Sequence, residues 1–90
     1  MESYRPALER WCEHEWGQLP QAISEWHADE DMAQVFMRLN RSVLIADFVV
    51  ENDGSLECKE HLQIPLDRWN PGSIQAFRTA DGRVRFRHRQ

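Results

Sequence analysis

The chain has 90 residues, of which 41% are hydrophobic and 29% are charged, and its formal net charge at pH 7 is −4. These totals exclude an intrinsically disordered chain, two separated cysteines exclude a disulfide framework, and no apolar run is long enough to cross a bilayer. We therefore expect one domain over residues 1–90, without a leader segment and located in the reducing cytoplasm. The core of such a small domain is small, which favours association with a partner or with a second copy.

The first predicted element is a helix that begins near Tyr4 and ends before Pro20. Pro6 fits an early helical position, where its missing N–H is not needed, and Gly17 fits the end of the helix. Apolar side chains recur at three- and four-residue steps, which places them on one face. They are Tyr4, Leu8, Trp11, Cys12, Trp16 and Leu19.

Helical structure is also predicted between Pro20 and Asn40. Acidic residues at positions 29–31 precede an apolar run, and Arg38 and Arg41 follow it, which is the charge order that the helix dipole favours. The sequence therefore predicts a helix over residues 31–39. A strand over Ala33–Leu39 is the alternative, because "AQVFMRL" half alternates between apolar and polar residues.

From Ser42 onward the apolar residues recur with a period of two, which predicts strands over residues 42–89. "SVLIADFVVE", "LECKEHLQI", "SIQAFRTA" and "RVRFRHR" are the four predicted strands. Asp53–Gly54 and Asp81–Gly82 supply hairpin turns. The predicted fold class is α+β, with a helical part over residues 4–40 and a sheet over residues 42–89. Two or three N-terminal helices would pack on one face of a four-stranded antiparallel β-meander.

Two short stretches, Cys12-Glu13-His14 and Cys58-Lys59-Glu60-His61, hold both cysteines and two of the four histidines. Two thiolates and two imidazoles are a common ligand set for zinc, which requires all four to converge on one centre. On a helix Cys12 and His14 diverge, and on a regular strand Cys58 and His61 point to opposite faces. We therefore predict no metal site and no cofactor, and interpret both cysteines as small apolar core residues.

Carboxylates occur at two further places where they suggest chemistry. His27 with Asp29, Glu30 and Asp31 could bind a metal or transfer protons, but the pattern is also typical of a helix start, which we favour. Asp47 and Glu60 stand among apolar strand residues. Buried carboxylates mark active sites, but an edge position, a bulge or an arginine partner from the last strand explains them as well. With no nucleophile or phosphate-loop motif in the chain, we predict no catalytic residue and no enzymatic activity.

The C-terminal strand carries the strongest functional signal. Because side chains alternate across a strand, four arginines fall on one face and repel each other, so an anionic group is expected opposite them. They are Arg83, Arg85, Arg87 and Arg89. The anionic group is either this chain's own acids, such as Glu57 or Asp81, or an external partner. A solvated outer face, with arginines that protect an edge strand, is the alternative without a binding function.

Two aromatic residues are predicted to anchor a partner beside these arginines. Trp69 lies in the polar loop "DRWNPG", where a tryptophan has little structural reason to occur, and tryptophan and arginine are enriched at interface hot spots. Packing of Trp69 over the end of the sheet is the alternative. Phe77 shares a strand face with polar residues and would suit a stacked base.

These features predict a small non-catalytic protein that binds, and inhibits or adapts, a larger macromolecule, as an inhibitor, immunity protein or phage-encoded regulator does. We expect the acidic surface of a protein partner and no membrane. A nucleic-acid-binding module is one alternative, although the acidic first 60 residues would repel phosphates. A small metal-dependent enzyme is a second alternative, and a homodimer formed by edge pairing of the last strand would also cover the arginines.

Overall fold

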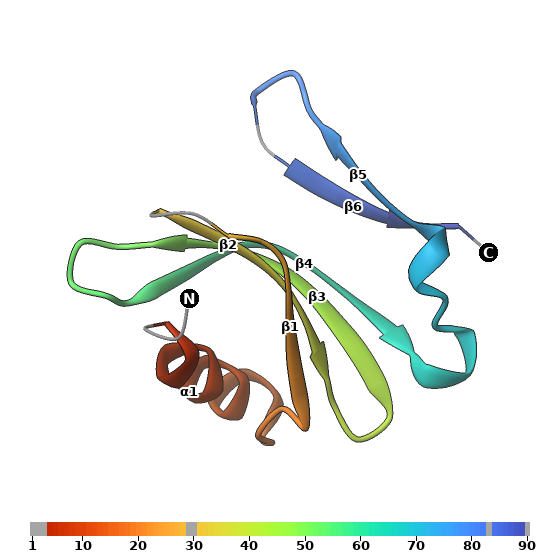
Figure 1. The fold of residues 1–90 in the computed structure, drawn as a ribbon, viewed down its shortest axis with the longest axis horizontal. Helices are drawn as coiled ribbons and strands as arrows, with labels where there is room; N and C mark the ends of the chain where they lie inside the picture. The colour runs from red at the N-terminus through yellow and green to blue at the C-terminus, as the bar shows by residue number, and fades with distance from the viewer. Residues whose placement is uncertain (1–3, 29–30, 83, 90) are drawn as a thin grey trace.

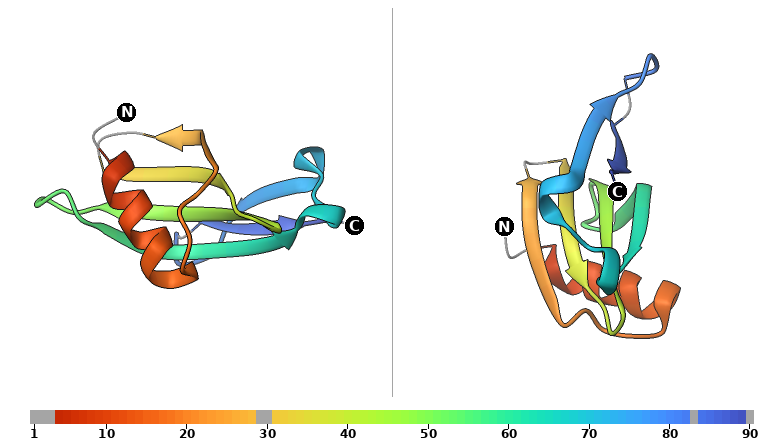
Figure 2. Two further views of the ribbon diagram at one scale, coloured as in Figure 1. Left: turned by 90° about the horizontal axis from the view of Figure 1, so that it is seen from below. Right: turned by 90° about the vertical axis from the view of Figure 1, so that its right-hand side faces the viewer.

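The computed structural model describes residues 4–28, 31–82 and 84–89, which form one α-helix and six strands in two antiparallel sheets. The elements are α1 (Arg5–Trp16), β1 (Ala22–Ala28), β2 (Met32–Arg38), β3 (Ser42–Val50), β4 (Leu56–Pro65), β5 (Ile74–Arg78) and β6 (Val84–His88), with the short 3-10 helices η1 (Leu66–Arg68) and η2 (Pro71–Ser73) between β4 and β5. Strands β1 to β4 form a meander in chain order, and β5 and β6 form a separate hairpin. The helix and the hairpin lie on opposite sides of the meander (Figures 1 and 2).

The prediction of two or three N-terminal helices is wrong, because the described residues between Gln21 and Leu39 are strands and α1 alone covers the inner face. Strand β2 lies between β1 and β3, so both of its edges are hydrogen-bonded. Its odd-numbered residues Ala33, Val35 and Met37 are fully buried against α1. The partial alternation of apolar and polar residues, which predicts a strand here, is therefore a better guide than the charges at the ends of the segment, which predict a helix.

The four-stranded antiparallel meander is present, but it is made of different strands from those predicted. It begins at Ala22 rather than at Ser42, and it ends at Pro65. The two last strands do not extend it; they pair with each other alone, in register from Ile74 opposite His88 to Arg78 opposite Val84. The Asp-Gly turns are confirmed, and Gly54 and Gly82 take the positive φ that such turns need.

The main core lies between α1 and the meander. The helix buries Tyr4, Leu8 and Cys12 against β2 and β3, as its predicted apolar face requires. Trp11 packs edge-on against Phe48, with ring centroids 4.8 Å apart. Leu8 and Cys12 are completely buried, so this contact stabilises the fold through the hydrophobic effect.

A β-bulge in β4 changes which side chains face the helix. The register shifts where Asp47 pairs with Glu60 and Phe48 pairs with Cys58, so Lys59 is the extra residue. Before the bulge Cys58 faces α1, and after it His61 does, with its ring 5.4 Å from that of Trp16. The prediction that Cys58 and His61 lie on opposite faces is therefore wrong. The bulge also turns Glu60 toward the hairpin.

An aromatic layer fills the space between the meander and the hairpin. Its rings are Trp26, Phe36, Trp69, Phe86 and His88. Neighbouring ring centroids are 5.4 to 6.5 Å apart, within the range of favourable aromatic pairs. None of these five side chains is fully buried, and Trp26 is 38% exposed. The hairpin thus covers the second face of the sheet only in part.

Candidate functional site

The predicted arginine strand is extended, and two of its arginines occupy the outer face of the hairpin. The register places Arg85 directly opposite Phe77, and the guanidinium carbon of Arg87 lies 4.9 Å from the centre of the Phe77 ring. Phe77, for which we predict polar neighbours on its own strand, thus has Arg85 and Arg87 of β6 beside it. Arg89 follows the strand and is exposed, while Arg83 lies outside the described residues.

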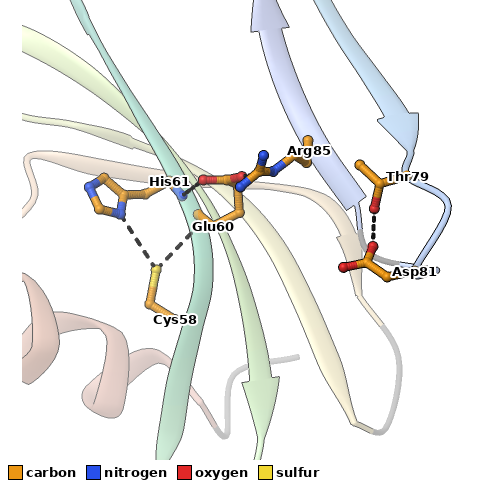
Figure 3. A network of polar contacts seen from close by, with 6 residues as sticks. All are labelled: Cys58, Glu60, His61, Thr79, Asp81 and Arg85. Carbon is orange, nitrogen blue, oxygen red and sulfur yellow. Dashed lines mark hydrogen bonds and ion pairs between the residues drawn. The ribbon is translucent and has the colours of Figure 1, made fainter.

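Arg85 is bound within the chain itself. Its Nε donates a hydrogen bond to Oε2 of Glu60 over 2.7 Å, and this ion pair joins β6 to β4 (Figure 3). An arginine partner from the last strand was one of the explanations offered for Glu60, and it is confirmed together with the bulge. The side chain of Arg85 remains 60% exposed, so the pair is solvated and weak.

Trp69 lies on the other side of the hairpin from Phe77. It follows η1 and packs edge-on against Phe36, at 5.5 Å between ring centroids, and roughly parallel to His88 at 6.5 Å. The structure thus places Trp69 over the end of the sheet, which was the structural alternative for it. It does not lie beside Phe77, so the predicted anchors belong to two different surfaces.

Arginines from distant segments meet at one end of the molecule, which we call the basic end. This end comprises the turn after β2, the helices η1 and η2, and the end of β6 (right in Figure 1). Its arginines are Arg38, Arg41, Arg68, Arg87 and Arg89. Leu66 N–H donates to the Arg41 carbonyl over 3.0 Å, which fixes η1 against this turn. Within residues 4–28, 31–82 and 84–89 none of these five guanidinium groups forms an ion pair with a carboxylate.

Two adjoining depressions lie at the basic end and share Arg68 and His88. One, of about 360 Å³, is completed by Asn70, Ser73 and Arg89. The other, of about 430 Å³, is lined by β4 residues from Leu62 to Pro65 and by Phe86 and Arg87. Sequence reasoning missed Arg68, Asn70 and His88, because the loop and the last strand are brought together only by the docking of the hairpin.

A third depression, of about 450 Å³, has mixed charge. It is lined by acidic and basic groups from both sheets, namely Asp31, Asp47, Lys59 and Arg78, together with Met32, Val49 and Gly82. Asp47 is buried on the hairpin side of β3, opposite Glu60 in the register. Of the predicted acidic cluster at the β1–β2 turn, only Asp31 and the backbone of His27 are described; Asp29, Glu30 and the His27 side chain lie outside the described residues.

The cysteine and histidine stretches do not assemble into a ligand set. Cys58 Sγ lies 4.0 Å from His61 Nδ1 and donates to the Glu60 carbonyl oxygen at 3.4 Å (Figure 3), whereas the His14 side chain is 86% exposed. Burial raises the pKa of Cys58 to about 11 and also raises the pKa of Cys12. Among the described side chains, no group of three or more His, Cys, Asp or Glu could hold a metal ion.

No family model, curated protein or solved structure gives a significant match to this chain. Over the described part of the chain, no helix has the length and apolar character needed to cross a membrane.

Proposed function

We propose that this protein is a non-catalytic binding protein that recognises the acidic surface of a larger protein through its basic end and the outer face of its hairpin. The observation that carries the proposal is that five arginines from three segments lie at one end, without an ion pair to any carboxylate of the described residues. Like charges at one end of a molecule are stabilised by an anionic partner.

Arginine suits such a surface better than lysine. Its planar guanidinium donates paired hydrogen bonds to carboxylates and is less strongly hydrated than an ammonium group, so it loses less on entering an interface. The half-buried aromatic layer lies beside the basic end, and Arg38 lines a depression of about 210 Å³ with Phe36 and Trp69. Arginine next to tryptophan is a common composition of interface hot spots.

A single-stranded nucleic acid is the second candidate, favoured by Phe77 between Arg85 and Arg87 on the outer face. Bases stack on exposed aromatic rings that lie beside cations. However, Arg85 already binds Glu60, so among the described residues of β6 Arg87 is the arginine left to bind a phosphate beside Phe77. The net charge of −4 also opposes a polyanion that extends beyond the basic end. We therefore place the protein partner first.

The test compares two double variants with the same change in net charge. Arg68→Gln with Arg89→Gln removes charge from the basic end, and Arg5→Gln with Arg10→Gln removes it from exposed positions of α1. Proteins captured from a lysate of the producing cells are purified, and their binding is measured by calorimetry at two salt concentrations.

A purified partner that binds the wild type and the α1 variant equally, and the basic-end variant much more weakly, supports the proposal. A partner that binds all three chains equally would move the interface elsewhere. Tighter binding of oligonucleotides than of any purified protein would replace the first candidate with the second.

A further inference from the structure

The smaller depression of the basic end is held in shape by hydrogen bonds of its own backbone. Arg89 N–H donates to the Ser73 carbonyl and Ser73 N–H donates to the Asn70 carbonyl, both over 2.9 Å. The Asn70 side-chain oxygen accepts from Gly72 N–H over 3.1 Å. Because that oxygen is occupied, the amide NH₂ of Asn70 is the part of the side chain left to bind a ligand. The end of β6 and the loop before β5 are thus fixed against each other before any partner arrives.

The lining of this depression is rich in hydrogen-bond donors. The residues that line it include Arg68, Arg89, Asn70 and Ser73, whose side chains carry two guanidinium groups, an amide and a hydroxyl, and no Asp or Glu lines it. His88 completes the wall, and its Nε2 is buried without a hydrogen-bond partner among the described residues. Buried polar atoms are nearly always paired, so His88 leaves in this wall a polar atom whose hydrogen bond the described residues do not supply.

We propose that this depression is a subsite for a phosphoryl group, carried by a phosphorylated side chain of the protein partner; the identity of the carrier rests on the proposed function. A phosphomonoester bears up to two negative charges and three terminal oxygens, whereas a carboxylate bears one charge and two oxygens. Two guanidinium forks, an amide and a hydroxyl match the former in charge and in donor number.

The adjoining depression favours a phosphorylated peptide segment over a nucleic acid. It shares Arg68 and His88 with the subsite, but the rest of its wall includes the apolar side chains of Leu62, Ile64 and Phe86. Arg68 and Arg87 also line this depression, so its apolar side chains are what favours a peptide with an apolar residue next to the phosphorylated one. Neither arginine of the subsite, Arg68 or Arg89, forms an ion pair with a carboxylate of the described residues.

The experiment is a titration of the full chain with O-phospho-L-serine, followed by backbone NMR, with L-serine as the control that lacks the phosphoryl group. We expect shifts confined to the amides around Asn70, Ser73 and Arg89. Arg68→Gln and Arg89→Gln should each weaken binding by about tenfold to a hundredfold, the loss of one charge-assisted contact. Arg10→Gln, with the same charge change on α1, should bind as the wild type does. Circular dichroism confirms that each variant is folded.

Absent shifts, shifts centred on Phe77 and Arg85, or equal weakening by Arg10→Gln would overturn the subsite. A short acidic peptide with phosphoserine, its unphosphorylated twin and a 5′-phosphorylated oligonucleotide identify the carrier. Tighter binding of the phosphopeptide than of the other two supports the proposal, and tighter binding of the oligonucleotide overturns it. If phosphoserine fails while a purified partner still depends on Arg68 and Arg89, the subsite is wrong and the proposed function stands.

Discussion

The hairpin of β5 and β6 should detach from the meander when Phe86 is shortened, while the meander stays folded. The ladder hydrogen bonds of the described strands lie within each sheet, so the hairpin is held by side-chain contacts, among them the aromatic layer and the Glu60–Arg85 pair. Phe86 joins β6 to that layer, with its ring 5.4 Å from that of Trp26 in β1. The perturbation that tests this arrangement is Phe86→Ala.

The expected cost follows from the partial burial of Phe86. Truncation of a fully buried phenylalanine to alanine costs about 3–5 kcal/mol. Phe86 is only half-buried, so we expect its truncation to weaken the free energy of hairpin docking by about 2 kcal/mol. This corresponds to about a 30-fold change in the equilibrium between the docked and the undocked hairpin. An isolated two-stranded hairpin is marginally stable in water, so undocking should also melt it.

Native-state hydrogen exchange distinguishes the two parts of the molecule. Amides of β5 and β6 should lose protection by about 30-fold, and amides of β3 should change much less. Phe77→Ala is the matched control, because it removes the same side chain from the opposite face of the same hairpin and should cost no more than about 1 kcal/mol. Equal loss of protection in β3 and in the hairpin would show one cooperative unit and refute the reasoning.

Two other predictions concern the core between α1 and the meander. Leu8→Ala should lower the free energy of unfolding in urea by about 3 kcal/mol, whereas Leu19→Ala, at a side chain that is 54% exposed, should change it by less than about 0.5 kcal/mol. Cys12 and Cys58 should not react with a thiol reagent at pH 8 unless denaturant is added, because burial keeps both thiols protonated; rapid reaction of the native protein would contradict the pKa of about 11 for Cys58.

The sequence predicts those elements whose signals are local. The spacing of Tyr4, Leu8 and Cys12 and the terminating Gly17 describe α1 correctly, and the Asp-Gly pairs locate the turns between β3 and β4 and between β5 and β6. These signals succeed because a helix face and a short turn depend on residues only a few positions apart. The extended conformation of the last strand was predicted on the same ground.

The sequence predicts a helix at β2 because the contacts that stabilise the strand come from residues distant in the sequence. Acids before it and arginines after it favour a helix in isolation, but Ala33, Val35 and Met37 gain more by complete burial between two neighbouring strands and α1. The choice is made by β1 and β3, which the segment itself cannot reveal. The same holds for the β4 bulge, because a single extra residue reverses every later side chain without a sequence signal of its own.

Hairpin docking and anion binding should be linked, because the subsite exists only where the loop of η1 and η2 meets the end of β6. Arg68 comes from η1 and Arg89 from the residue after β6, and the Arg89–Ser73 hydrogen bond holds them in one wall. In a variant whose hairpin is docked for only a fraction of the time, the apparent affinity for the ligand is the intrinsic affinity multiplied by that fraction. Phe86→Ala should therefore weaken phosphoserine binding with both arginines intact, while Phe77→Ala should leave it unchanged. The contradicting result is a Phe86→Ala protein whose hairpin amides exchange freely but whose affinity for phosphoserine is that of the wild type. In that case the arginines would bind the anion without a docked hairpin.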